Sequence, residues 1–408
     1  MVSDGNGFNG SDSFSGSGSF HDSDSASGFP ARPTAELAPV LAWLRRGEAV
    51  HARTDFPAGT ALPDGRLDLC KQDLGPLGAE AVADALPEGG GPVRHLLLGT
   101  DGLGDGGAAA VAPKAVAAHV ETLYLGCNNI GGGGVCEIAG QLIAAPGVVK
   151  ALWLKRNPVG PDGVRAVAET VRAGTVLRTI DLTQTGLATP DVAVLVDAMI
   201  AAAGGQHAVE RLYLSGNRLG TDGAQDVARL IVAGAVAELY LSAAQLGDSG
   251  ARVLAAALQN APGGALRRLS VASNGIGSAA LAELIAAAAT AGVELFDAAR
   301  VKAAAVLGAE DNRLDESGAA TVADALAAPH RLAYLNLHHT GLGSRGALRL
   351  LDGAQRAAAA TRFKLGGGIA KRVKKELTAL AADIPASVFD VAPDVRAIRS
   401  VYRTAPPA

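Results

Sequence analysis

Few residues of this chain are arranged as catalytic or metal sites usually are. The glycine run at residues 131–134 could cradle a phosphate, but no Lys-Ser or Lys-Thr pair follows it. His338 and His339 could bind a metal, but the nearest cysteine in the sequence, Cys136, is far away. We also expect neighbouring residues of a strand to point in opposite directions. The sequence contains no Gly-x-Ser-x-Gly, His-Glu-x-x-His or Cys-x-x-Cys motif. We therefore predict a non-enzymatic protein without a metal or another cofactor.

A second set of residues has a chemistry that suits binding. Tyrosine and tryptophan combine a large apolar area with few rotatable bonds and a polar tip, which makes them common anchors at protein interfaces. The chain has 2 Trp, 5 Tyr and 8 Phe, so only 15 of its 408 residues are aromatic. Four of them occupy equivalent positions in short apolar segments, a fifth lies one strand step earlier, and two basic residues flank the row. The predicted partner-binding residues are Tyr124, Trp153, Lys155, Tyr213, Tyr240, Tyr334 and His338.

These residues belong to a repeated unit. One copy, residues 212–224, reads Leu-x-Leu-x-x-Asn-x-Leu-Gly-x-x-Gly-Ala and precedes an alanine-rich segment with helical spacing. The pattern predicts a short strand, a turn and a helix. One strand and one helix cannot bury their apolar faces alone, so about ten or eleven copies must stack into a solenoid. The second apolar residue of the strand recurs at Leu69, Leu98, Leu125, Leu154, Leu182, Leu214, Leu241 and Val271, and then near Ala309, Leu337 and Leu365.

The period and the Leu-Gly-x-x-Gly-Ala motif before a full helix resemble one class of leucine-rich repeat. This is the ribonuclease-inhibitor-like (RI-type) class, which is also found in Ran GTPase-activating proteins and NLR receptors. The resemblance covers roughly residues 62–366. It implies an α/β horseshoe with a parallel sheet on the concave face and helices on the convex face. Strands need about 4.8 Å each and helices about 10 Å, which also favours bending toward the strands. The alternation of strand side chains then places the aromatic row on the concave face.

The asparagine of the repeat has a structural interpretation. In proteins of this class it stacks into a ladder that hydrogen-bonds the backbone of neighbouring turns, which would otherwise be buried and unpaired. The position is occupied by Asn128, Asn157, Asn217, Asn274 and Asn312, by the polar substitutes Gln72, Asp101, Thr185 and Thr340, and by Ala244 as a gap. We predict a structural role for these residues.

The repeat at residues 293–312 departs from the pattern and has two interpretations. In the first, residues 293–295 form the strand and residues 297–309 are an insertion, which places Glu294 on the concave face. In the second, residues 306–309 form the strand and the insertion comes before it. We favour the first, because residues 293–295 directly follow a well-formed helical pattern. The insertion is either a binding element on one rim or a tolerated variation in length.

The two ends of the chain differ from the repeats. Residues 1–30 are rich in Gly, Ser and Asp, so we predict a disordered tail that is either inert or binds through its phenylalanines. We predict an N-terminal cap helix within residues 31–61, the array at 62–366 and a basic C-terminal cap at 367–408. From residue 361 onward nine basic residues face four acidic ones, a local charge of +5. The alternative role of this end is contact with nucleic acid or an anionic membrane.

Composition limits the remaining classes of function. The net charge of -4 provides no overall attraction for nucleic acid. Three cysteines are too few for a disulfide framework and suit a reducing compartment. The sequence shows neither a signal peptide nor an apolar run of about 18 residues. We therefore expect a cytoplasmic monomer without a membrane span, and the heavy use of Ala and Gly suggests a bacterial source.

The predicted function is that of a non-enzymatic interaction scaffold, which binds a partner protein or peptide on its concave face. Exposed tyrosine and tryptophan side chains would be its anchors. The alternative is a GTPase-activating protein of the Ran type, which the resemblance implies without any matching residue in this chain.

Overall fold

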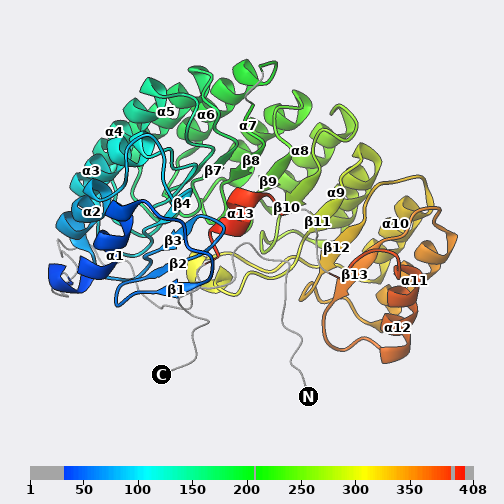
Figure 1. Ribbon diagram of the computed structural model, residues 1–408. Helices are drawn as coiled ribbons and strands as arrows, with labels where there is room; N and C mark the ends of the chain where they lie inside the picture. Colours follow the sequence, from blue (N-terminus) through cyan, green and yellow to red (C-terminus); the bar gives the residue numbers. More distant parts are fainter. Residues whose placement is uncertain (1–31, 206–207, 387–390, 400–408) are drawn as a thin grey trace. The chain divides into compact units, whose positions relative to one another are not determined.

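The protein is described by a computed structural model that covers residues 32–205, 208–386 and 391–399. The described residues belong to two compact units. The N-terminal unit contains residues 32–187, the described part of 204–209, and residues 391–399, while the C-terminal unit contains residues 188–203 and 210–386. The predicted tail at residues 1–30 lies outside the described residues. In both units short strands alternate along the chain with helices (Figure 1).

The N-terminal unit begins with helix α1 and a short hairpin, and then repeats strand and helix. Its elements are α1 (Thr34–Arg46), β1 (Thr54–Asp55), β2 (Thr60–Ala61), β3 (Arg66–Asp68), α2 (Gly75–Asp84), β4 (His95–Leu97), α3 (Gly104–Ala117), β5 (Thr122–Tyr124), α4 (Gly132–Ala144), β6 (Ala151–Trp153), α5 (Gly160–Arg172), β7 (Thr179–Asp181) and α13 (Pro393–Ala397). Strands β3 to β7 pair in parallel in sequence order. Strands β1, β2 and β3 pair antiparallel at the edge.

The C-terminal unit has the same alternation. Its elements are α6 (Thr189–Ala202), β8 (Arg211–Tyr213), α7 (Gly220–Val232), β9 (Glu238–Tyr240), α8 (Gly247–Gln259), β10 (Arg268–Ser270), α9 (Ser278–Ala291), β11 (Leu295–Asp297), the 3-10 helix η1 (Ala304–Leu307), α10 (Glu316–Ala327), β12 (Tyr334–Leu337), α11 (Ser344–Arg356), β13 (Arg362–Leu365) and α12 (Lys371–Leu380). Strands β8 to β13 pair in parallel in sequence order. The predicted α/β solenoid is confirmed.

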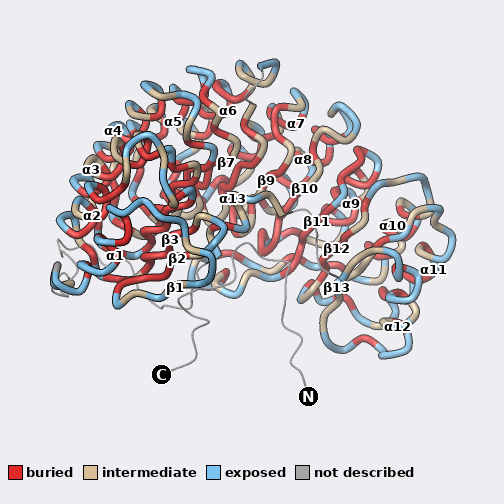
Figure 2. The backbone as a smooth tube through the Cα atoms, in the orientation of Figure 1, coloured by how far each residue is buried: buried red, intermediate tan, exposed pale blue. Residues whose placement is uncertain are grey.

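The core of each unit lies between the strands and the helices. The central residue of each parallel strand is apolar and buried, as Leu123 and Leu212 are. The facing sides of the helices carry small residues such as Ala168 and Ala255, which let the two layers approach closely. Exposed residues are concentrated on the outer turns of the helices and in loops (Figure 2).

Two glycines explain the Leu-Gly-x-x-Gly-Ala motif. Gly220 has φ of 59°, a left-handed conformation that glycine adopts without strain. A Cβ at Gly223 would come within 2.6 Å of the Leu219 Cβ. The first glycine therefore permits the turn into α7, and the second permits the close packing of its first turn.

The asparagine ladder is confirmed. Asn128 Nδ2 donates to the carbonyls of Leu98, at 2.6 Å, and Leu125, at 2.9 Å. Its Oδ1 accepts from the backbone N–H of Asp101 at 2.8 Å. Asn157 repeats the arrangement one turn later, with its Oδ1 accepting from Asn128 N–H at 2.9 Å. Each amide thus connects two successive repeats and satisfies backbone groups that water does not reach.

Asp101 is an imperfect member of this ladder. Its Oδ1 accepts from Gln72 N–H at 2.7 Å, but its buried Oδ2 has no hydrogen-bond partner among the described residues. A carboxylate cannot donate to carbonyls as the asparagine amide does. Burial, the largest cause, raises the pKa of Asp101 well above its usual value near 3.8.

We expect Asp101→Asn to raise the free energy of unfolding by about 1–3 kcal/mol at neutral pH, because the new amide can donate and carries no charge. The folded state of the wild type disfavours ionised Asp101. The resulting loss of folding stability is complete above the raised pKa of Asp101 and disappears as the pH falls toward 3.8. The gain should therefore shrink on acidification. Denaturant unfolding of both proteins across this pH range measures it, and a gain independent of pH would contradict the explanation.

The irregular repeat is only partly as predicted. Strand β11 is formed by Leu295–Asp297, and the second interpretation is wrong because residues 304–307 form η1. The favoured interpretation is wrong about the strand's register. Phe296 is buried toward the helices, Asp297 takes the outward third position, and Glu294 precedes the strand and is exposed. Phe296 pairs in register with Leu269 of β10 and Leu335 of β12, which are buried central residues, so it faces the helices as they do.

The insertion follows β11 and packs against the array. Asn312 resumes the ladder, since its Nδ2 donates to the carbonyls of Val271 at 2.8 Å and Ala298 at 3.1 Å. Ala304 and Ala309 pack with Ala243 from the turn that follows β9.

The N-terminal cap contains two strands that were not predicted. Helix α1 buries Leu37 and Leu44 as expected, but β1 and β2, which the sequence analysis missed, extend the sheet edge beside it. In the C-terminal unit, α12 buries Val373 and Leu377 and contacts α11, as a cap should. The C-terminal cap was predicted to cover residues 367–408. Residues 391–399, which contain α13, belong instead to the N-terminal unit.

Candidate functional site

The candidate site is the face of the strands that the repeat helices do not cover. We call it the helix-free face and define it, in each unit, by the first and third residues of β3 to β13, which flank the inward central residue. Tyr124, Trp153, Tyr213 and Tyr240 occupy third positions, and Tyr334 occupies a first position. The aromatic row therefore lies on the predicted side of the strands.

These aromatic side chains were expected to be exposed to solvent, and this expectation is wrong for most of them. Trp153 is 2% exposed, Tyr124 4% and Tyr213 8%. Tyr334 is also buried, and only Tyr240 is partly exposed. Adjacent strands are about 4.8 Å apart, so large rings on neighbouring strands cover one another. Their truncation would disturb packing as well as any contact with a partner.

Tyr213 and Tyr240 stack, as the sequence predicts for adjacent strands. Their ring centroids are 4.1 Å apart and their planes differ by 2°. The Tyr240 hydroxyl donates to Glu238 Oε2 at 2.8 Å. Burial, followed by the charge of Glu238, raises the pKa of Tyr240 above its usual range. The pair is thus a neutral, oriented aromatic surface.

A row of charged residues at first positions accompanies this pair. Glu238 Oε1 lies 3.6 Å from Arg211 Nε and 3.4 Å from Arg268 Nη1. The Glu238 side chain is only 5% exposed, compared with 10% and 14% for the two arginines. This row was not predicted, although its signal is present in the sequence as Arg, Glu and Arg at equivalent positions of three consecutive repeats.

In the N-terminal unit the basic candidate Lys155 lies beside the aromatic residues. Its Nζ is 5.3 Å from the centroid of the Tyr124 ring, within the range of a cation–π contact. Burial raises the pKa of Asp181, and the positive charge of Lys155 opposes that shift. Lys155 thus acts on both a ring and a buried carboxyl of this face.

His338 and His339 were predicted to point in opposite directions, and this prediction is wrong. They follow the end of β12, and His339 has φ of 66°, so strand alternation no longer applies. Their ring centroids are 3.9 Å apart in an edge-on arrangement. Across the described residues, no group of three His, Cys, Asp or Glu side chains could hold a metal ion.

Several polar residues of the face have a local structural role. The side chains at third positions accept hydrogen bonds from the backbone N–H two residues later, which fixes the turn after the strand. The pairs are Asp68 with Cys70, Asp181 with Thr183, Asp297 with Ala299, and Asn336 with His338.

Comparisons with known proteins agree with this architecture. A sequence model of the Leucine Rich repeat family matches residues 116–139, from the end of α3 into α4. The chain has the fold of a leucine-rich repeat protein. Its fold is similar to that in a crystal structure of the Rad7 and Elc1 complex in yeast, with a TM-score of 0.52, 13% identity, and coverage of 86% of this chain and 81% of that one. No curated protein is significantly similar in sequence.

A second similar structure is the leucine-rich repeat-containing protein LegL7 from Legionella pneumophila. The match has a TM-score of 0.47 and 16% identity, and it covers 76% of this chain and 95% of that one. At these identities the similarity concerns the fold alone.

Residues near the C-terminus contact the helix-free face in each of the two units. In the C-terminal unit, Arg362 donates to the carbonyls of Ala381 at 2.7 Å and Ile384 at 2.9 Å. The Tyr334 hydroxyl donates to the carbonyl of Pro385 at 3.2 Å. In the N-terminal unit, residues 391–399 contact β3 and β7. No pattern in the sequence predicts these contacts.

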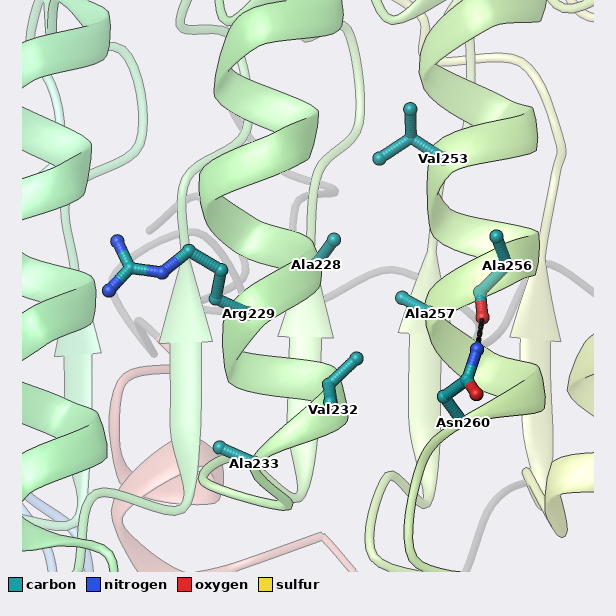
Figure 3. Close-up of a pocket in the computed structure, with 8 residues that line it drawn as sticks. All are labelled: Ala228, Arg229, Val232, Ala233, Val253, Ala256, Ala257 and Asn260. Atoms are coloured by element: carbon teal, nitrogen blue, oxygen red, sulfur yellow. Dashed lines mark hydrogen bonds between the residues drawn. The ribbon is translucent and has the colours of Figure 1, made fainter.

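The repeats also form a shallow groove on their outer surface. It lies between α7 and α8, has a volume of about 450 Å³, and includes Val232, Val253 and Ala256 (Figure 3). Its lining is mainly apolar and offers few polar groups to orient a ligand. None of the described helices is both long and apolar enough to cross a membrane.

Proposed function

We propose that this leucine-rich repeat protein is a non-enzymatic interaction scaffold that binds a partner protein or peptide on its helix-free face. The observation that carries the proposal is the stacked pair of Tyr213 and Tyr240 beside the Arg211–Glu238–Arg268 row. These side chains are already held by contacts with one another, so a partner need not order them. Such preorganisation reduces the entropic cost of binding.

The other predicted residues have supporting roles in this proposal. Tyr240, Lys155 and His338 are partly exposed and are proposed to contact the partner directly. Buried Tyr124 and Trp153 in one unit, and Tyr213 and Tyr334 in the other, are proposed to shape the surface beneath it.

The alternatives have less support. No residue of this chain can be matched to the Ran-type GTPase-activating function. Among the basic C-terminal residues, Lys374 Nζ donates to the Gly366 carbonyl at 2.6 Å. Arg372 pairs with Glu376 at 2.7 Å, and Arg362 is bound to backbone carbonyls. These three cations already have partners within the protein, which weakens the case for nucleic acid or an anionic membrane.

The test is capture of partners from the native host by wild type and by Tyr240→Ala, with quantitative mass spectrometry. A partner of the helix-free face should lose about 2 kcal/mol of binding free energy, or about 30-fold in affinity, in this variant. Tyr240→Phe keeps the ring and loses only the hydrogen bond to Glu238, so its loss should be smaller.

The matched control is Val232→Ala in the groove between α7 and α8. Val232 is 45% exposed, so this change should affect neither folding nor binding. Melting temperatures of all three variants check the fold. A partner that is lost from Val232→Ala and retained by Tyr240→Ala would place binding in the outer groove instead.

A further inference from the structure

Residues 391–399 lie on the helix-free face of the N-terminal unit in the manner of a bound peptide. Asp394 Oδ2 accepts a hydrogen bond from Thr179 Oγ1 of β7 at 2.5 Å. The carbonyl of Arg399 accepts from Arg66 Nη1 of β3 at 2.6 Å. Strands β3 and β7 are four pairings apart, roughly 19 Å at the usual strand spacing. The segment therefore crosses the sheet instead of extending one strand. Helix α13 is drawn on the side of these strands away from α2 to α5 (Figure 1).

The first positions between these two anchors are covered. Thr122 and Ala151 are completely buried, although no repeat helix lies over this face. His95, which pairs with Thr122 Oγ1 at 2.9 Å, is also buried, and the Asp394 charge acts on it. Ala397 of α13 is 3% exposed, so one side of this helix is buried, while Pro393, Arg396 and Arg399 are exposed. The face can therefore hold a short peptide and bind its carboxylate and a backbone carbonyl.

The contacts of the segment suit reversible binding. Its polar contacts with the strands include the Asp394 and Arg399 hydrogen bonds, which an equivalent carboxylate and carbonyl of another peptide could replace. Its advantage over a free peptide is that it is part of the same chain, which gives it an effective concentration of up to about millimolar. A partner with a larger interface could displace it.

We propose that residues 391–399 are a built-in ligand of the helix-free face, and that the partner is a peptide segment that displaces them by offering its own carboxylate to Thr179. This regulation rests on the proposed function, since the segment lies on the helix-free face of the N-terminal unit, which carries the candidates Tyr124, Trp153 and Lys155. The binding of the segment to the face can nevertheless be measured without any partner.

The experiment uses the full-length chain and a fluorescein-labelled peptide of residues 391–399, followed by fluorescence anisotropy. In the wild type the built-in copy occupies the face, so the peptide should bind weakly. In Asp394→Ala the built-in copy is weakened, and we expect peptide affinity to rise at least tenfold. The matched control is Asp383→Ala, an exposed aspartate of the same C-terminal region, which should behave as the wild type does.

Two further controls assign the binding to the face. Adding Thr179→Val to Asp394→Ala removes the hydroxyl with little change in shape, and should abolish the gained affinity. A labelled peptide that carries Asp394→Ala should bind none of the proteins tightly. Equal affinity of the original peptide for wild type and Asp394→Ala, or gained binding that survives Thr179→Val, would overturn the proposal.

The partner assay separates the two proposals. If Asp394→Ala also binds the captured partner more tightly, the segment is a competitor. If it gains peptide affinity without any gain for the partner, the regulatory proposal is overturned, while the Tyr240 result still decides the proposed function. If partner binding depends on Tyr240 but the peptide binds neither the wild type nor Asp394→Ala, the proposal of a built-in ligand is wrong and the proposed function stands.

Discussion

Replacing Glu238 with alanine is expected to lower the free energy of unfolding by about 3–5 kcal/mol. Glu238 is buried between Arg211 and Arg268 and also accepts the hydrogen bond of the Tyr240 hydroxyl. Its loss removes the negative charge between two guanidinium groups that have little access to water. Leaving a buried charge without its partner costs more than the ion pair itself contributes. Chemical denaturation with a circular dichroism signal measures the change.

Glu210→Ala is the matched control for this variant. Glu210 also pairs with Arg211, at 2.9 Å, but its side chain is 34% exposed. Solvent screens such a pair, so the control should lose less than about 1 kcal/mol. Glu238→Gln should fall between the two, since it keeps an acceptor for Tyr240 without the charge. Equal small losses in Glu238→Ala and Glu210→Ala would show that the cluster is solvated.

Replacing Asn274 with alanine is expected to cost about 3 kcal/mol or more, because several buried backbone groups lose their partner at once. Its Nδ2 donates to the carbonyls of Leu241 at 2.9 Å and Val271 at 2.8 Å. Its Oδ1 accepts from Ala244 N–H at 2.8 Å. Alanine satisfies none of these groups, and the closely packed turn has little room for water. Thermal and denaturant unfolding measure the loss.

Asn260→Ala controls for the substitution itself. Asn260 follows α8, is exposed, and donates to the Ala256 carbonyl at 2.8 Å (Figure 3). Water can replace that contact, so the loss should stay below about 1 kcal/mol. A similar loss in both variants would show that the Asn274 amide is not needed within the ladder.

The features that were predicted correctly are those that repeat. The spacing of Leu125, Leu154 and Leu182 fixes the alternation of strand and helix, because each copy must bury the same apolar faces. The same spacing predicts that Tyr213 and Tyr240 stack, since equivalent residues of consecutive strands are neighbours. The asparagine ladder is implied by the resemblance to the leucine-rich repeat class, and its members recur with the same spacing.

The features that were missed depend on neighbours that the repeat does not define. The burial of Trp153 depends on what surrounds its ring on the assembled face, which strand alternation alone cannot give. Thr179 and Asp394 are 215 residues apart in the sequence, and Arg66 and Arg399 are 333 residues apart. No local pattern carries such contacts. In β11 two apolar residues, Leu295 and Phe296, could each face the helices, and only packing selects one of them.

The insertion after β11 changes how opening can spread through the C-terminal unit. In an ideal solenoid each repeat contacts only its nearest neighbours, so stability is a sum of local terms and one end can fray alone. Here Gln245 Nε2, from the repeat of β9, donates to the Leu307 carbonyl of the insertion at 3.3 Å, across the repeat of β10. Ala243 packs against the same insertion. The repeats of β9, β10 and β11 are therefore joined in one cooperative block, whose members must open together.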